Sequence, residues 1–355
     1  MEQFLQQTGQ VGKYILLGVS ITAAIVGICA LVLLSWVSII TSIGGMTNAA
    51  LYREVKSGLD SLPKQTDFRK NILILGVDSV ANREGDPVLT DTIMVVSINF
   101  KTGKVSLLSF PRDLWSEKYL TKINALYVYG DQFYPGQPEK LTAEVVSELS
   151  GLPIHHTFVV SLDMVAQLID TVGGVEVAIP ESFTDSQFPR SDVPIDSTDP
   201  AILYETVTFE QGTEVLSSAR ALQYIRSRKS ASEEQGTDLA RSQRQQQVIT
   251  ALFKKITSPA VLTNNKVLGQ LLLWYQTHFA GEMALSEAVA TARYLLPYIL
   301  GRSQSIQVES YSLSVYPDTT AGVIEHPNPR LYQNNWVYIV RDLVALQAEI
   351  KTYLE

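Results

Sequence analysis

Arginine side chains gather in one short stretch of an otherwise acidic chain. The stretch is residues 225–247, IRSRKSASEEQGTDLARSQRQQQ, and the formal net charge of the whole chain is −8. Arginine presents a planar fork of N–H donors that matches the oxygens of a phosphate group. The cluster therefore indicates a site for a compact anion such as pyrophosphate, and the alternative is a solvated helix face. Its basic members are Arg226, Arg228, Lys229, Arg241 and Arg244.

The spacing of these residues brings several of them to common faces. In an extended segment, Arg226 and Arg228 would point to the same side, because side chains alternate along a strand. Arg241 and Gln245 are four residues apart, which puts them on one face of a helix. Asp238 lies one turn before Arg241 and is expected either to cap that helix or to support the site.

Two aspartates adjoin neighbouring predicted strands. Asp78 ends the apolar run 71–77, and Asp91 begins the next strand. Strand ends often carry functional groups, and Mg²⁺ prefers carboxylate oxygens and often bridges to substrate phosphates. Asp78 and Asp91 are therefore candidate Mg²⁺ ligands, the alternative being two turn aspartates. Arg112 follows a third strand and could join them, or it could form a salt bridge to Asp113.

Acids and arginines at the ends of segments suit phosphoryl transfer assisted by Mg²⁺. The chain contains none of the motifs GxxxxGK[ST], HExxH or GxSxG. It has no basic surplus and no basic stripe interleaved with aromatic residues, which argues against nucleic acid as a partner. His155 and His156 are adjacent, so in a strand they would point to opposite faces and serve poorly as joint metal ligands.

Alternating strands and helices must position these residues. The pattern indicates an α/β fold with a mixed central β-sheet flanked by helices on both faces. Residues 183–200 are expected to form a loop, and Thr213 and Glu214 are expected to open a helix. The predicted strands are 71–77, 91–100, 104–110, 156–161 and 175–179, the second and third forming a hairpin.

The N-terminal part holds one long apolar run, Tyr14–Ile43, without a charged residue. About 20 apolar residues span a bilayer, and the apolar part of a signal peptide is shorter, about 7–15 residues. A single-pass protein of the cell membrane is therefore expected, with its C-terminal domain extracytoplasmic, although the basic flanks of the span lean weakly the other way. The predicted division is a cytoplasmic tail at 1–13, a transmembrane helix at 14–43, a polar stalk at 44–69, a catalytic domain at 70–258 and a C-terminal extension at 259–355, packed on that domain or following it.

Six segments together resemble the LytR–CpsA–Psr family of cell-wall glycopolymer ligases. They cover about residues 70–258 and occur in the family's order, a combination more specific than any single motif. The segments are NILILGVDS at 71–79, LTDTIMVVSINFKTGKVSLLSFPRDLW at 89–115, KINALYVYG at 122–130, VSLDMVAQLIDTVGGVEVAIPE at 160–181, ARALQYIRSRK at 219–229 and DLARSQRQQQVI at 238–249.

The resemblance implies a phosphotransferase held outside the membrane by its N-terminal helix. Its donor would be a glycan linked to polyprenyl pyrophosphate, its acceptor a hydroxyl of peptidoglycan or of another cell-wall polymer, and its by-product polyprenyl phosphate. A pyrophosphatase acting on the same lipid and a non-catalytic lipid-binding regulatory ectodomain stay open as alternatives. By position, the resemblance implies that Asp78 and Asp91 are catalytic acids associated with Mg²⁺, and that Arg112 is catalytic and also binds pyrophosphate. It implies a supporting role for Asp238. The further pyrophosphate-binding residues that it implies are Arg226, Arg228, Arg241 and Gln245.

Overall fold

The computed structural model describes most of the chain. The described residues are 22, 26–78, 88–190, 193, 200–230, 235–301 and 306–355. Of Pro200, Ala201 and Asp238 only the backbone is described. The predicted cytoplasmic tail at 1–13 and most of the first part of the predicted span lie outside these residues.

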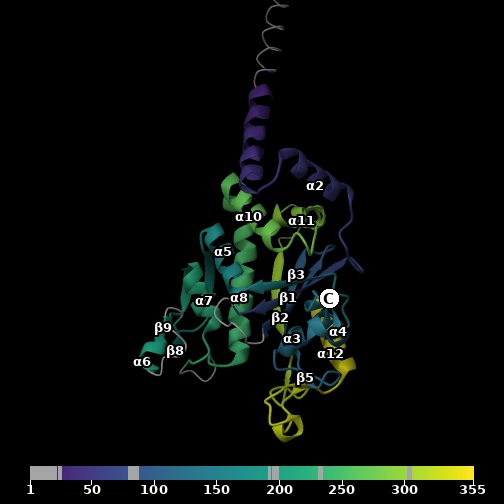
Figure 1. Cartoon of the computed structure of the whole chain (residues 1–355), viewed down its shortest axis with the longest axis vertical. Helices are drawn as coiled ribbons and strands as arrows, with labels where there is room; N and C mark the ends of the chain where they lie inside the picture. Colours follow the sequence, from purple (N-terminus) through teal and green to yellow (C-terminus); the bar gives the residue numbers. More distant parts are fainter. Residues whose placement is uncertain are drawn as a thin grey trace, which may run out of the picture.

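A mixed sheet forms the centre of the domain, as the sequence predicts (Figure 1). It has five strands within the described residues, and the predicted strand 175–179 is not one of them, because it pairs in a separate small sheet. Strand β1 (Arg69–Val77) pairs antiparallel with β2 (Thr90–Asn99) and parallel with β6 (His156–Ser161). Strand β2 also pairs antiparallel with β3 (Lys104–Phe110), which confirms the predicted hairpin. Strand β11 (Gln307–Ser312) pairs parallel with β3 and completes the order β11-β3-β2-β1-β6.

Both faces of this sheet are buried, because neighbouring residues along a strand point to opposite sides. On β1, Leu73 and Leu75 belong to one core cluster and Ile72 belongs to another. Helices cover both faces, as predicted. The first face is covered by α3 (Leu126–Phe133), α4 (Glu139–Ser150) and α12 (Leu343–Leu354), and the second by α5 (Leu162–Val172), α8 (Asp238–Ile256), α10 (Asn265–His278) and α11 (Leu285–Ile299).

A third core cluster lies beside the sheet, around α7 (Ser218–Arg226) and two small two-stranded sheets. The predicted helix at Thr213 is wrong: β10 (Gly212–Leu216) pairs there with β7 (Val175–Ile179), and α7 begins only after Ser217, whose side chain caps it. The predicted loop 183–200 is wrong in its first part. Strand β8 (Phe183–Pro189) pairs there with β9 (Tyr204–Phe209), which follows the short helix α6 (Pro200–Leu203).

The residues beyond 258 belong to the same body. They supply β11 to the central sheet, and α12 packs its Leu346 and Ile350 into the first core cluster. The remaining short elements are β4 (Trp115–Ser116), β5 (Thr121–Lys122), η2 (Ile123–Ala125), α9 (Pro259–Leu262), β12 (Val315–Tyr316), β13 (Ile324–Glu325), η3 (Pro329–Tyr332) and β14 (Ile339–Val340).

The N-terminal helix stands out from the domain (Figure 1), and its described part, Val26–Ile43, is long and apolar enough to cross a membrane. Its end packs on α10 through two glycines. A Cβ atom on Gly44 would lie 2.6 Å from the Leu272 side chain, and one on Gly269 would lie 2.8 Å from Ile43 Cβ. These close approaches hold the domain directly against the end of the apolar helix.

The segment that follows is more than a polar stalk. Helix α2 (Asn48–Asp60) packs along α11, so closely that a Cβ atom on Gly58 would lie 2.4 Å from the carbonyl oxygen of Ser286. The carboxylate of Glu54 accepts a hydrogen bond from the backbone N–H of Ser286 at 3.0 Å. The sequence missed this helix because its inner face alternates apolar residues, Leu51 and Val55, with Glu54 and Gly58, so its apolar pattern is weak.

An ion-pair triad joins α11 to the central sheet. Glu287 Oε1 lies 2.6 Å from Lys70 Nζ on β1 and 2.8 Å from His156 Nε2 on β6. Burial alone would raise the pKa of Glu287, but the hydrogen bonds and charges of Lys70 and His156 outweigh it and lower the pKa to about 2. The ring nitrogens of His156 are hydrogen-bonded to the Glu287 carboxylate and to the Glu282 carbonyl, so this histidine has a structural role here.

Replacing Glu287 with Gln is expected to lower the free energy of unfolding at pH 7 by about 2–3 kcal/mol. The folded pKa lies below the ordinary value of 4.5. The stabilisation is therefore complete above about pH 4.5 and is lost as the pH falls towards 2. Urea unfolding at pH 7 and pH 3 measures both effects, with the exposed Glu282→Gln as the matched control. Equal stability of wild type and Glu287→Gln at pH 7 would contradict this role.

Candidate active site

Three strand ends meet at one edge of the central sheet, and each carries a predicted site residue. Asp78 follows β1, Asp91 is the second residue of β2, and Arg112 lies two residues beyond β3. Because β2 runs antiparallel to both of its neighbours, its start lies beside their ends. The sheet topology therefore brings Asp78, Asp91 and Arg112 to the same edge of the sheet.

A bulge gives Asp91 its position. Gly76 pairs with Thr92 and the next residue, Val77, pairs with Thr90, so Asp91 is the extra residue of β2 at a break in the register. Bulges commonly re-aim a side chain near a functional site. A Cβ atom on Gly76 would lie 2.7 Å from Thr92 Cβ, so only glycine allows the two strands to approach this closely.

The carboxylate of Asp91 is held between two guanidinium groups. Arg112 Nη1 donates to Asp91 Oδ1 at 2.8 Å, and Arg228 Nη2 donates to Asp91 Oδ2 at 2.8 Å. Arg112 Nε also lies 3.5 Å from Asp113 Oδ2. The predicted salt bridge to Asp113 is thus present, and Arg112 also contacts one of the two predicted acids, Asp91.

Burial alone would raise the pKa of Asp91. The hydrogen bond from Arg112 and the charges of Arg228, Arg112 and Arg241 outweigh burial and hold the pKa below its ordinary value. Arg241 is therefore part of the same electrostatic group, and it is buried at 4% exposure. Gln245 accepts a hydrogen bond from the Thr92 hydroxyl at 3.0 Å. Arg112, Arg228 and Arg241 thus form one group around the ionised Asp91 carboxylate, and Gln245 contacts the next residue in the chain, Thr92.

A buried aspartate that the sequence did not reveal anchors the Arg228 segment. Asp185 on β8 is 1% exposed. Its Oδ2 accepts from the backbone N–H groups of Arg228 at 2.9 Å and Lys229 at 3.1 Å, and its Oδ1 accepts from Gln187 at 3.0 Å. Asp185 is 43 residues from Arg228 in sequence, so no local pattern links the two.

Arg244 also serves this segment rather than the anion site. It is 2% exposed and donates to the carbonyl oxygens of Tyr224 at 3.0 Å, Ser227 at 2.5 Å and Gln235 at 3.1 Å. Backbone carbonyls use these donors, so Arg244 holds the backbone that carries Arg226 and Arg228.

Two sequence expectations about this segment need correction. Arg226 does not lie in an extended strand: it is the last residue of α7, and its guanidinium carbon lies 5.5 Å from the centre of the Phe188 ring. Thr237, and not Asp238, caps α8, because its side chain accepts from Ala240 N while Asp238 is already helical. The possible supporting role of Asp238 stays a prediction.

Replacing Asp185 with Asn is expected to lower the free energy of unfolding by about 1–3 kcal/mol, since a buried carboxylate that accepts three N–H groups loses part of this bonding. It should also weaken anion binding, because the backbone at Arg228 loses its anchor. Urea unfolding and calorimetric titration with a short polyprenyl pyrophosphate measure the two effects. The exposed Asp170→Asn on α5 is the control, and a variant as stable as this control would contradict the anchoring role.

The residues that could hold a metal ion are the two strand-end acids. Within the described ranges, no group of three or more His, Cys, Asp or Glu side chains comes together as a metal site. A Mg²⁺ ion, however, is commonly held by only one or two carboxylates together with water and substrate phosphates. The ionised Asp91 beside the end of β1, where Asp78 lies, fits such a donor set.

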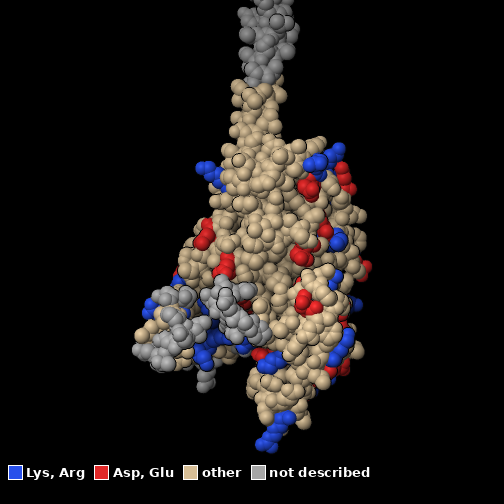
Figure 2. Space-filling view, in the orientation of Figure 1, with Lys and Arg blue, Asp and Glu red and all other residues tan. Residues whose placement is uncertain are grey.

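Positive charge is concentrated where this site lies. Figure 2 shows Lys and Arg side chains gathered in a recess between the part of the domain that carries β8 and β9 and the central body, whereas the surface next to the N-terminal helix is mostly uncharged. An acidic protein that presents cations in a recess can attract a compact anion there.

Several curated relatives of this chain are named as transferases of teichoic acid to peptidoglycan. One relative, the polyisoprenyl-teichoic acid–peptidoglycan teichoic acid transferase TagU of Oceanobacillus iheyensis, is 34% identical over 208 residues, which are 58% of this chain and 57% of the relative. TagU of Bacillus subtilis is 28% identical over 199 residues, 55% of this chain and 54% of the relative. The chain thus spans a little over half the length of these curated relatives.

Solved structures share the fold at low sequence identity. The crystal structure of B. subtilis TagV matches with a TM-score of 0.54 and 21% identity, covering 81% of this chain and 96% of TagV. The Streptococcus agalactiae protein gbs0355 matches with a TM-score of 0.55 and 22% identity, covering 81% and 88%.

The LytR_cpsA_psr family matches residues 36–315, a range that includes the end of the apolar helix, the five strands of the central sheet and all the arginines described above. This match covers well over half of the chain. The chain therefore belongs to the LytR–CpsA–Psr family.

Proposed function

We propose that the protein is a membrane-anchored phosphotransferase that moves a glycopolymer from a polyprenyl-pyrophosphate carrier to a cell-wall acceptor hydroxyl. The observation that carries this proposal is the ionised Asp91 carboxylate between Arg112 and Arg228, with Arg241 beside them. The names of the relatives, which are transferases of teichoic acid from a polyisoprenyl carrier to peptidoglycan, support the same substrate classes.

The reaction would be a displacement at phosphorus. The oxygen of the acceptor hydroxyl bonds to the sugar-side phosphorus and its proton passes to water. The bond from that phosphorus to the bridging oxygen breaks, and polyprenyl phosphate leaves with the bridging oxygen. The arginines stabilise negative charge that develops on the bridging and non-bridging oxygens. Asp91 is a weak base because its pKa is lowered, so its proposed part is to hold the guanidinium groups and a cation rather than to accept the hydroxyl proton.

We further propose Mg²⁺ as the cofactor, with Asp78 and Asp91 as its protein ligands. When bound, the ion would offset charge on the phosphate oxygens. Arg112, Arg228 and Arg241 would orient the pyrophosphate, and Gln245 would hold the Thr92 hydroxyl next to Asp91.

The proposed location is the cell membrane, with the domain outside the cytoplasm. The close packing of the apolar helix on α10 supports a domain that rests at the membrane surface, where a lipid-linked donor is confined. Protease added to intact cells should then digest the domain, and protection of the domain would contradict this orientation.

The experiment for the proposed activity is reconstitution of the full chain with a glycan-linked polyprenyl pyrophosphate, Mg²⁺ and peptidoglycan. We expect polyprenyl phosphate to be released only when the acceptor is present. Release at the same rate without acceptor would instead favour a pyrophosphatase, and no release under either condition would favour a non-catalytic lipid-binding protein.

A further inference from the structure

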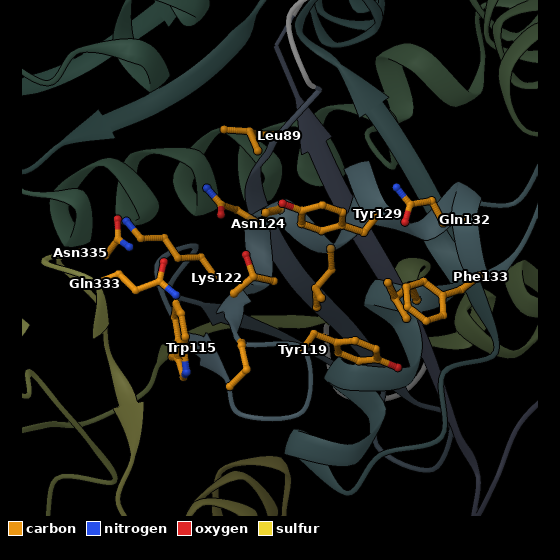
Figure 3. A pocket seen from close by; sticks show the side chains of 15 residues that line it. Leu89, Trp115, Tyr119, Lys122, Asn124, Tyr129, Gln132, Phe133, Gln333 and Asn335 are labelled. Carbon is orange, nitrogen blue, oxygen red and sulfur yellow. The ribbon is translucent and has the colours of Figure 1, made fainter. Parts of the chain in front are cut away.

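A pocket of about 610 Å³ lies beside the arginine–aspartate site, and the proposed chemistry does not use it (Figure 3). Its volume falls within the range of roughly 300–1,000 Å³ that is usual for small-ligand sites. Leu89, two residues before Asp91, lines it. Asn124 also lines it, and its backbone N–H donates to the Arg112 carbonyl at 3.2 Å. The pocket therefore adjoins the point where the phosphorus would react.

Aromatic rings form part of the pocket wall. Tyr129 and Phe133 are one turn apart on α3 and are 44% and 54% exposed, which is unusual for large rings on a folded domain. Tyr119 packs edge-on against Phe133 with ring centres 5.6 Å apart, and Trp115 lies at the other side of the pocket in Figure 3. These rings offer flat apolar surfaces to a ligand.

Four uncharged amide side chains also line the pocket, beside aliphatic ones such as Leu120 and Leu126. Asn124, Gln132, Gln333 and Asn335 line the pocket, and each amide offers both donors and acceptors. The one cation, Lys122, is 2.6 Å from Asp113 Oδ1 and is therefore already compensated. Flat apolar rings beside neutral donors and acceptors complement a sugar, which has an apolar C–H face and a rim of hydroxyl groups. A prenyl chain would leave these amides buried without partners, at a cost in free energy.

One side of the pocket comes from the C-terminal segment, beyond the family match that ends at residue 315. Gln333 and the following Asn334 both have left-handed backbone angles, with φ of 59° and 60°. Consecutive non-glycine residues in this region are uncommon and are held by surrounding structure. Here Tyr338 holds the segment, since its carbonyl accepts from Trp115 N at 2.8 Å and its N–H donates to the Asp113 carbonyl at 3.0 Å.

We propose that this pocket is a saccharide-binding subsite, and that the C-terminal segment around Gln333 and Asn335 gives it selectivity. The proposal rests on the proposed function, since a sugar held here lies next to the phosphorus that would react. The sugar would belong either to the acceptor glycan or to the glycopolymer of the donor, because both present the same hydroxyl-rimmed rings.

The test uses the full chain in detergent and titrates it with chitobiose and with a soluble peptidoglycan disaccharide. Tyr129→Ala and Asn335→Ala are the test variants, since both change side chains that line the pocket and that have no assigned part in the arginine–aspartate site. Leu331→Ala is the matched control, because this side chain is 78% exposed in the same C-terminal segment but does not line the pocket. We expect saturable binding of at least one sugar to the wild type and to the control, and affinity lower by about tenfold or more in each test variant.

Two further arms identify the source of the sugar and exclude the lipid. In the transfer assay, a higher KM for the acceptor alone would assign the pocket to the acceptor glycan, and a higher KM for the donor alone would assign it to the donor glycan. A sugar-free polyprenyl pyrophosphate should bind wild type and variants equally. Weaker binding of that lipid to the variants, with unchanged sugar binding, would overturn the proposal in favour of a lipid pocket.

The outcomes separate this proposal from the proposed activity. Sugar binding that both variants weaken, in a protein that catalyses no transfer, would support the subsite and refute the activity. If the wild type catalyses transfer but sugar binding is absent, or is equal in all variants, the activity would be supported and the subsite refuted.

Discussion

Replacing Asp91 with Asn is expected to reduce turnover by about a hundredfold or more while leaving the fold intact. Asn keeps the shape of the side chain but loses the charge that holds both Arg112 and Arg228 at 2.8 Å. The loss of one preorganised electrostatic partner commonly costs about 10²–10³ in rate. The side chains of Asp91 and Arg228 are 34% and 43% exposed, so the ion pairs contribute little to stability.

The measurement for Asp91→Asn is initial rate at saturating donor, together with thermal unfolding. Asp318→Asn is the control, because Asp318 is an exposed carboxylate in the C-terminal part of the chain. Asp78→Asn should also lose activity and, if it is a metal ligand, should need more Mg²⁺ for half-maximal rate. If Asp91→Asn reacted at the same rate as the control, the Asp91 carboxylate would have no part in the mechanism.

Replacing Arg228 with Lys is expected to weaken the binding of a short polyprenyl pyrophosphate by about 10- to 100-fold. Lys keeps the positive charge but loses the planar fork that can bind a carboxylate and a phosphate at once. Each charge-assisted contact is expected to matter by about 1.5–3 kcal/mol. Arg112→Lys should behave similarly, because it loses the matching hydrogen bond to the other oxygen of Asp91.

Arg226→Lys tests whether the end of α7 also reaches the ligand. The sequence predicts that Arg226 binds the pyrophosphate with Arg228, and we expect a loss of affinity here too. Calorimetric titration compares these variants with Arg330→Lys, an exposed arginine outside the site, for which a change below about 0.5 kcal/mol is expected. If the wild type and all these variants bound the ligand with equal affinity, the arginine cluster would be a solvated surface and not a binding site.

The central strands could be predicted because both of their faces are buried, so that each appears as an apolar run of strand length. Ile93 and Met94 on β2 face opposite core clusters, so the run appears as one apolar strand that ends at polar residues. The strand ends in turn located Asp91 and Arg112, which the structure joins directly. Local pattern and sheet topology were sufficient for this part of the site.

Other parts depend on contacts between residues far apart in sequence. Thr213 and Glu214 resemble a helix start, yet pairing with β7 makes them part of a strand. Arg244 belongs to the same local cluster as Arg241, but distant carbonyl groups take up its donors. Asp185 had no local signal at all, because its partners are backbone N–H groups of a segment more than forty residues away. Composition alone cannot separate an arginine that binds a ligand from one that binds the backbone.

The most direct test of the proposed activity is to run the reaction in H₂¹⁸O and to weigh the glycan product by mass spectrometry. Transfer to a sugar hydroxyl gives a phosphodiester between glycan and acceptor that contains no ¹⁸O, together with unlabelled polyprenyl phosphate. We predict this product for the wild type and its near absence for Asp91→Asn. A glycan phosphate carrying one ¹⁸O atom as the main product would mean that water is the acceptor, and it would contradict the assignment of this site to glycopolymer transfer.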